Sequence, residues 1–427
     1  MLPICSKDSD PCFVLFDLVV GGHHATYIQH FIEYWNSKRL RQPLYIIVAP
    51  EFAEVHADVY ALAHDHASRN VHFVVISQAE AIAIQTSKSL IRRSFREWQL
   101  FCQYAKALNA AQALLMYFDH LQVAIALGSP APCPVSGIYF RPTFHYASFA
   151  QHRASWQDRL RAWRQRLVLA LAARNPRLTT LFCLDPFAIS PIQKHVPRIQ
   201  AVHLPDPVAP FEAASIDAAH PMSQAIEPER YVFLLFGNLD QRKGITQVLA
   251  AIKLLPREII EKICLLLVGK LLPEDASTIL SQIQTIEQTT PIQIVLHNRF
   301  VSESEMQHVF RRSDIVLIPY QRHVGMSGVL LQAAMAEKPV LASNYGLLGE
   351  LVRTYELGIT IETENCEQIA KSLASFVTDS RHRMGKVQNM QDFVQNHTPQ
   401  HFVETILTTV KFPFELDWDS STSRVVL

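Results

Sequence analysis

One stretch of the chain, residues 313–351, restricts the possible folds more than any other. It contains a short, β-branched apolar run at 315–319, which is typical of a buried parallel strand. Residues 329–337 have the composition of a helix. The following Lys338-Pro339 ends that helix and starts a second buried strand, because the residue before a proline is pushed out of helical geometry. The order strand, loop, helix, strand predicts a doubly wound α/β fold.

The loop inside this unit predicts a ligand site. It carries Gly325, Met326, Ser327 and Gly328, and it lies at the carboxyl end of a predicted strand, where doubly wound sheets bind ligands. The helix that follows begins with unpaired backbone N–H groups, which suit a phosphate. We therefore expect these four residues to contact a phosphorylated ligand.

A second glycine loop has a similar place in the sequence. The apolar run 231–236 is followed by GNLDQRKG and then by a predicted helix. Arg242 and Lys243 put positive charge beside the start of that helix, which is the environment that a departing nucleoside diphosphate needs. We predict that Lys243, together with Arg242, is catalytic, and that Gly237 and Asn238 bind the same ligand.

The N-terminal part of the chain repeats the order of a strand, glycines and a helix. The apolar run 13–20 is followed at once by Gly21, Gly22 and two histidines, and a helical pattern continues to residue 36. This order is typical of the entry to a Rossmann-like domain. Either His23 or His24 is placed to contact a substrate, and we take His23 as the candidate catalytic residue.

Composition and charge exclude several classes of protein. The 427 residues suffice for two domains that each bury a core. Lysine plus arginine and aspartate plus glutamate number 39 each, so charge gives no reason to expect nucleic-acid binding. Seven widely spread cysteines argue against a disulfide framework or a zinc site and favour a reducing compartment. No signal-peptide pattern opens the chain, and we expect a soluble, cytoplasmic protein.

Two segments in the second half resemble a known signature. Residues 332–340, QAAMAEKPV, and residues 345–352, YGLLGELV, are similar to the C-terminal motif of the family 4 (group 1) retaining glycosyltransferases. Lys243-Gly244 also matches the Lys-Gly pair that lies upstream in that family. The resemblance covers about residues 231–373, and it implies the GT-B fold.

The family motif also contains two glutamates that this chain lacks. Gln332 stands at the second glutamate position, and the first falls on Val324, or on Gly325 if the loop is one residue shorter. In the family the first glutamate contacts the donor sugar and the second holds the nucleotide ribose. Gln332 can still hydrogen-bond a ribose through its amide, although without charge assistance.

The resemblance implies a fold, an activity and a set of site residues. The fold is α/β, with two Rossmann-like doubly wound domains facing a central cleft. The activity is transfer of a hexosyl group from a nucleotide-sugar to a saccharide or lipid-linked acceptor, with retention of configuration, as in polysaccharide biosynthesis. The family requires no metal and no other cofactor. The donor-binding residues would be Gly21, Gly22, Gly237, Asn238, Gly325, Met326, Ser327, Gly328, Gln332 and Glu350.

The same resemblance suggests domain limits. An N-terminal acceptor domain would occupy residues 1–207, a linker 208–230, and a donor domain 231–400. A C-terminal helix and tail at 401–427 would cross back to the first domain. We expect surface helices after Gly358.

Three residues of the N-terminal half are candidates for the acceptor side: Arg141, His145 and Asp185. The last of them keeps open a different reaction, because a nucleotide-sugar epimerase on this fold needs an acid/base carboxylate in the first domain. The missing glutamates keep open a third possibility, a homologue that binds a nucleotide-sugar or a partner enzyme without turnover.

The segment 153–177 is the most basic part of the chain. Its seven arginines, Trp156, Trp163 and a run of leucines predict a long amphipathic helix. One interpretation is peripheral contact with the inner face of a membrane, which suits a lipid-linked acceptor. The other is a solvated helix with its apolar stripe in the core, and we favour this one.

Overall fold

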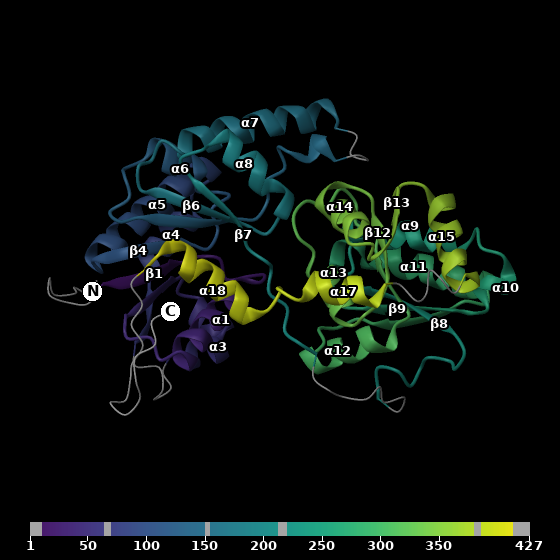
Figure 1. Cartoon of the computed structure of the whole chain (residues 1–427). Helices are drawn as coiled ribbons and strands as arrows, with labels where there is room; N and C mark the ends of the chain where they lie inside the picture. The colour runs from purple at the N-terminus through teal and green to yellow at the C-terminus, as the bar shows by residue number, and fades with distance from the viewer. Residues whose placement is uncertain (1–10, 64–69, 150–153, 212–219, 380–385, 413–427) are drawn as a thin grey trace. The chain divides into compact units, whose positions relative to one another are not determined.

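The structure, a computed structural model, describes residues 11–63, 70–149, 154–211, 220–379 and 386–412. The chain packs as two compact units. The first consists of Met1–His145, Ser155–Pro207 and Pro399–Leu427, and the second of Tyr146–Ala154 and Val208–Thr398. Each unit is described by itself (Figure 1), and the domain limits drawn from the sequence stay a prediction.

The first unit is built on a 7-stranded parallel sheet of order β3-β2-β1-β4-β5-β6-β7. Its strands are almost continuously apolar, as expected where helices cover both faces of a parallel sheet. They are β1 (Cys12–Phe16), β2 (Leu44–Val48), β3 (Val71–Val75), β4 (Ala110–Leu115), β5 (Val135–Tyr139), β6 (Leu178–Cys183) and β7 (Gln200–His203).

The second unit has a 6-stranded parallel sheet of order β10-β9-β8-β11-β12-β13. Its strands are β8 (Tyr231–Phe236), β9 (Ile263–Val268), β10 (Gln293–His297), β11 (Ile315–Ile318), β12 (Val340–Ser343) and β13 (Gly358–Ile361). The two sheets together confirm the predicted fold class of two doubly wound α/β domains.

Helices lie on both faces of each sheet (Figure 1). In the first unit they are α1 (His24–Ser37), α2 (Phe52–Val55), α3 (Ala57–Leu62), α4 (Gln78–Gln85), α5 (Leu90–Ala107), α6 (Gln122–Leu127), α7 (Trp156–Ala172), α8 (Ile189–His195) and α18 (Pro399–Val410). In the second they are α9 (Ile245–Ile252), α10 (Arg257–Ile260), α11 (Pro273–Thr289), α12 (Glu303–Arg312), α13 (Gly328–Met335), α14 (Gly346–Thr354), α15 (Cys366–Thr378) and α17 (Val387–Val394). No helix in the described ranges has the length and apolar character needed to cross a bilayer.

The strand order places one switch point in each sheet. The chain moves outward from β1 through β2 to β3 and then returns to β4 on the other side of β1. In the second sheet the same reversal falls between β8 and β11. Doubly wound sheets bind ligands outside the carboxyl ends of the strands at such a point. The loops after β1 and β4, and those after β8 and β11, are therefore the first places to examine.

Two local expectations from the sequence need correction. The chain after residue 358 does not consist of helices alone, because Gly358–Ile361 pairs with β12 as the edge strand β13. The apolar stripe of the basic helix 153–177 is not in the core, because Trp156 and Trp163 of α7 are 71% and 62% exposed.

Candidate functional site

The second-unit site begins with the glycine loop after β8. Gly237 has φ +102°, and a Cβ there would lie 3.0 Å from the Lys243 Nζ, so only glycine suits both the backbone and the lysine. Gly244 has φ +75°, and a side chain there would collide with the carbonyl oxygen of Pro319 after β11. These two glycines bring Lys243 to the switch point between β8 and β11.

Lys243 is held by two acceptors. Its ammonium donates to the Tyr320 hydroxyl at 2.6 Å and to the Phe236 carbonyl oxygen at 3.2 Å, and it lies 4.2 Å from the centre of the Tyr320 ring. An ammonium has three N–H donors, so one remains for a ligand. Burial lowers the pKa of Lys243 to about 8, with Arg242 adding to the shift and Asp240 opposing it.

Tyr320 connects the lysine to the second glycine loop. It follows β11, is 5% exposed, and its hydroxyl also hydrogen-bonds the Ser327 side chain. Ser327 in turn caps α13 by accepting from the Leu330 N–H at 3.4 Å. Lys243 and the loop of Gly325 to Gly328, predicted separately from the sequence, are thus joined through one tyrosine.

The loop before α13 presents backbone donors. Gly325 lies at φ +93°, and its N–H donates to the Tyr146 hydroxyl at 3.3 Å. The carbonyl oxygen of Met326 lies 3.3 Å from the His323 Nε2. Gly328 is the first residue of α13, so its N–H belongs to the positive end of that helix. The arrangement suits an anion beside Lys243.

Gln332 lies on the second turn of α13, close to this loop. Its Oε1 is buried and has no hydrogen-bond partner among the described residues. A buried amide oxygen left without a donor costs about 1–3 kcal/mol, so a ligand hydroxyl there would offset that cost. Glu350, on α14, instead accepts from the Arg353 guanidinium at 2.6 Å, and both side chains are 22% exposed.

The other two candidates of the β8 loop point toward solvent. The Arg242 side chain is 81% exposed and forms an ion pair with Asp240 at 2.6 Å, while Asn238 is exposed. Asp240 is itself buried and also accepts from the Lys243 N–H at 3.1 Å. Arg242 therefore lies near Lys243 with its charge largely balanced, and its catalytic role stays a prediction.

A second candidate site lies at the switch point of the first sheet. Asp17 follows β1, is buried, and accepts from the Val19 N–H at 3.0 Å through one carboxylate oxygen. Its other oxygen lies 2.6 Å from the His24 Nδ1. The His24 ring stacks on Phe140 at a centroid distance of 5.9 Å. This carboxylate fixes the orientation of the His24 ring.

His23, the predicted catalytic histidine, is placed differently. It is exposed at the start of α1, directly after Gly21 and Gly22, with its ring 6.5 Å from that of Tyr27. Tyr27 donates to Asp206, and burial raises the pKa of both groups. The ordered histidine of this loop is therefore His24 rather than His23.

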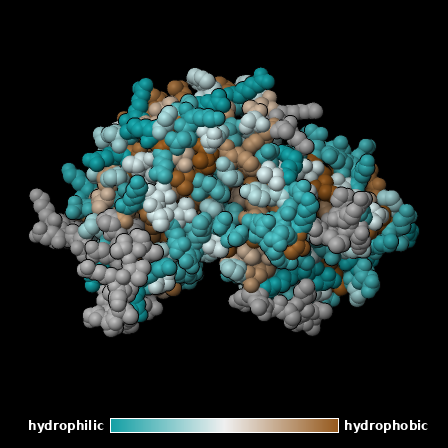
Figure 2. All heavy atoms as spheres, in the orientation of Figure 1, coloured by the Kyte–Doolittle hydropathy of each residue, from teal (hydrophilic) through white to brown (hydrophobic). Residues whose placement is uncertain are grey.

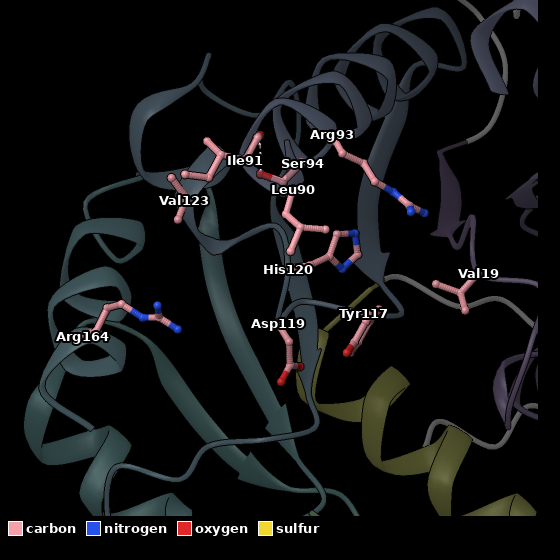
Figure 3. A pocket seen from close by; sticks show the side chains of 10 residues that line it. All are labelled: Val19, Leu90, Ile91, Arg93, Ser94, Tyr117, Asp119, His120, Val123 and Arg164. Atoms are coloured by element: carbon pink, nitrogen blue, oxygen red, sulfur yellow. Dashed lines mark hydrogen bonds between the residues drawn. The ribbon is translucent and has the colours of Figure 1, made fainter. Parts of the chain in front are cut away.

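A pocket of about 480 Å³ adjoins the loop after β4 (Figure 3). Tyr117, Asp119 and His120 come from that loop, Val19 from the loop after β1, and Arg164 from α7. Burial raises the pKa of Asp119 to about 6, even though the N–H groups of residues 140 and 141 donate to its carboxylate. The pocket therefore combines a carboxyl that titrates near neutrality with cationic and apolar walls.

Of the three acceptor-side candidates, the structure brings two together. His145 and Asp185 form a buried pair, with 3.0 Å between the His145 Nε2 and the Asp185 Oδ2, and the side chains are 2% and 1% exposed. Asp185 also accepts from the Phe187 N–H at 2.9 Å, which caps a short helix. Arg141 is exposed, and its backbone N–H donates to Asp119.

Four residues of these sites were not among the candidates from the sequence: Tyr320, Tyr117, Asp119 and His120. The catalytic role of His23 stays a prediction. One signal was available for all of them. Each of these residues follows an apolar run that became a strand next to a switch point, namely β11 or β4. Polar residues directly after such strands are the natural candidates.

Comparisons with known proteins agree with this geometry. Residues 218–391 match the family described as glycosyl transferases group 1. D-inositol 3-phosphate glycosyltransferase of Rhodococcus opacus (strain B4) is 24% identical over 191 residues, which is 44% of this chain and 42% of that protein. The chain thus spans less than half the length of this curated relative.

Two solved structures show the same fold over nearly the whole chain. Sucrose-phosphate synthase from Thermosynechococcus elongatus has a TM-score of 0.66 at 15% identity, covering 94% of this chain and 98% of that one. Anabaena HepE, solved in complex with UDP and glucose, has a TM-score of 0.60 at 14% identity, covering 94% and 100%. The two parallel sheets and these structural matches show the GT-B fold. The match to the group 1 glycosyltransferase family covers residues 218–391, which is less than half of the chain.

Proposed function

We propose that the protein is a retaining glycosyltransferase. It would move a hexosyl group from a nucleotide-sugar to a saccharide or lipid-linked acceptor in the cytoplasm. The observation that carries this proposal is the link from Lys243 through Tyr320 to Ser327, which joins a half-buried cation to a helix N-terminus at one switch point. HepE, whose solved structure contains UDP and glucose, shares the fold, and this supports a nucleotide-sugar donor.

The chain's own groups account for departure of a nucleoside diphosphate. The free N–H of Lys243 would donate to a diphosphate oxygen, and the N–H groups at the start of α13, from Gly328 onward, would bind the same anion. Negative charge develops there as the sugar–phosphate bond breaks, and preorganised donors stabilise it. The buried Oε1 of Gln332 would accept from a ribose hydroxyl, which replaces the charged contact of the family's glutamate.

Retention would follow a front-face substitution in which the leaving phosphate takes the acceptor proton. This step is inferred from the family resemblance, since the sequence shows no evident side-chain nucleophile. Glu350 is bound to Arg353 and would order α14 beside the site. We also propose that no metal is needed, because Lys243 and the loop amides supply positive charge.

The experiment is nucleotide release by the purified protein over a panel of UDP-, GDP- and ADP-sugars, with and without EDTA. Lys243→Met is the test variant, and Lys253→Met, an exposed lysine at the end of α9, is its matched control. Release from one donor that is lost only in Lys243→Met supports the proposal and names the donor. Binding of a donor without release with any acceptor would favour a non-catalytic homologue.

The epimerase alternative gains no support from the first unit. Asp185, the carboxylate that it would need, is fully buried, pairs with His145 and caps a short helix. Isomerisation of a nucleotide-sugar in the absence of any acceptor would nevertheless overturn the transferase proposal.

A further inference from the structure

Helix α7 is amphipathic in the opposite sense to an ordinary surface helix. Its apolar side chains Trp156, Leu160, Trp163 and Leu167 are 71%, 56%, 62% and 45% exposed. Their spacing of four, three and four residues puts them on one face of the helix. We call these four residues the α7 stripe. It runs along a surface of the first unit on which apolar and polar residues are mixed (Figures 1 and 2).

The side of α7 that faces the protein is held by polar contacts. Gln165 accepts from the Thr143 N–H at 3.0 Å and donates to the Arg141 carbonyl oxygen at 3.0 Å. Arg166 donates to the Phe144 carbonyl oxygen at 3.0 Å. Leu169 and Ala172 near the C-terminal end of the helix are buried in the core, and the small side chains of Ala162 and Ala170 pack against it. The α7 stripe is therefore exposed, because the contacts that hold the helix on the protein are made by the opposite side of the helix.

The charges beside the α7 stripe indicate which kind of partner would cover it. The helix carries four arginines, all exposed, and a single acid, Asp158, which is occupied in the N-terminal capping box. At 100° per residue, Arg159 flanks the stripe on one side and Arg164 flanks it on the other. Two tryptophans within an apolar stripe, bordered by arginines, are the composition of a helix that lies in a membrane interface.

The pocket of the first unit continues this surface. Its lining includes Arg164 of α7 and also Leu90 and Ile91, which open α5 and are 83% and 57% exposed. Apolar side chains at the rim of a pocket suit an amphiphilic ligand more than a free sugar. A lipid layer covering the stripe would therefore lie beside the pocket.

We propose that the α7 stripe docks on the surface of an anionic lipid bilayer. The tryptophans and leucines enter the boundary between head groups and acyl chains, and the flanking arginines contact lipid phosphates. Attachment is peripheral and reversible, and it does not depend on the donor chemistry of the second unit. It brings the pocket of the first unit to the place where a lipid-borne acceptor would be found.

The test is co-sedimentation of the full chain with two kinds of vesicle, phosphatidylcholine alone and phosphatidylcholine mixed with phosphatidylglycerol. We expect binding to the mixed vesicles that weakens with added salt, because each arginine near an anionic surface contributes about fivefold to affinity. Trp156→Ser/Leu160→Ser/Trp163→Ser should lose at least about tenfold in affinity, since three apolar side chains that would enter the bilayer are removed. Arg159→Gln/Arg164→Gln, which removes the two arginines that flank the stripe, should weaken binding to the mixed vesicles and leave binding to phosphatidylcholine vesicles unchanged.

The matched control replaces three other exposed apolar side chains, Val55, Leu254 and Leu280, by serine. It should bind vesicles as the wild type does. Tryptophan quenching by brominated lipid gives a second measurement on the unaltered chain, because Trp156 and Trp163 are exposed while Trp35 and Trp98 are buried.

Three results would overturn the proposal. They are wild-type protein that binds neither vesicle, stripe variants that bind as well as the wild type, and a wild-type dimer that the stripe variant abolishes, which would make a second copy the occupant. Nucleotide release from a soluble donor should be the same in the stripe variant and the wild type. A failed docking test therefore leaves the transferase proposal unaffected. A failed test of nucleotide release likewise leaves the docking proposal unaffected.

Discussion

The two sheet edges have the same topology and opposite chemistry. After β8 and β11 the second unit offers a half-buried lysine, two glycine turns and a helix N-terminus, so backbone groups and one cation form the site. After β1 and β4 the first unit offers side chains held in pairs, above all Asp17 with His24. A diphosphate is the same in every nucleotide-sugar, whereas acceptors differ. The backbone edge therefore suits the donor and the side-chain edge suits the acceptor.

The largest effect should come from Lys243→Met. Loss of one preorganised donor at a developing negative charge costs about 10²–10³-fold in turnover. The thermal stability of the ligand-free protein should not fall, because burial already disfavours the charged lysine. Initial rates of nucleotide release and a melting curve would test both parts. A variant with near wild-type rates would remove Lys243 from the mechanism.

Tyr320→Phe keeps the ring under the lysine and removes only the hydroxyl. Lys243 then loses its acceptor at 2.6 Å, and Ser327 loses its link to the lysine. We expect donor affinity to fall about tenfold, the value of one hydrogen bond to a charged group. Titration calorimetry with the donor would measure it. Tyr104→Phe, which removes a hydroxyl bound to Glu80 in the first unit, is the control and should leave affinity unchanged.

His24→Ala should act on the acceptor alone. The variant frees Asp17 and the Phe140 ring face, so acceptor-dependent turnover should fall about tenfold while donor release in the absence of acceptor is unchanged. His23→Ala, at the exposed neighbour, is the matched control and should change little. Equal losses in the two variants would contradict the ordering role of Asp17.

Gln332→Leu should separate binding from stability. Donor affinity should fall about fivefold with the loss of one neutral hydrogen bond. The melting temperature without ligand should stay the same or rise, because a buried oxygen without a partner is removed. A lower melting temperature with unchanged affinity would show that Gln332 is structural.

The pH dependence should be the smallest effect. Lys243 must be protonated to bind a diphosphate, and its pKa lies at about 8, so the protonated fraction falls as pH rises through that value. The kcat/KM for donor release should therefore be about half its plateau value near pH 8 and decline further above it. A flat profile through this range would show that the lysine charge does not limit donor capture.

More residues of the site after β8 and β11 than of the site after β1 and β4 were candidates from the sequence, for a physical reason. Gly237 and Lys243 lie within one short loop, so their spacing in the sequence already indicates that they are close in the structure. Tyr320 lies 77 positions from Lys243, and only the order of the strands brings them together. The same holds for His120 and Glu97, which are separated by 23 positions.

The α7 stripe shows a second limit. Its spacing was legible in the sequence, but the side that faces the protein depends on Gln165 and on its partner Thr143 after β5. A helix with an apolar side and a basic side can pack against the protein through either side. The contacts that other segments make with the helix determine which side faces the protein. The expectation of a buried stripe was therefore wrong, although the helix itself was predicted correctly.

The most direct test of this division between the two edges is titration of UDP, GDP and ADP into three proteins: wild type, Lys243→Met and His24→Ala. The account predicts that one of the three nucleotides binds the wild type, that Lys243→Met loses this binding, and that His24→Ala keeps it unchanged. Loss of binding in His24→Ala, or undiminished binding in Lys243→Met, would contradict it.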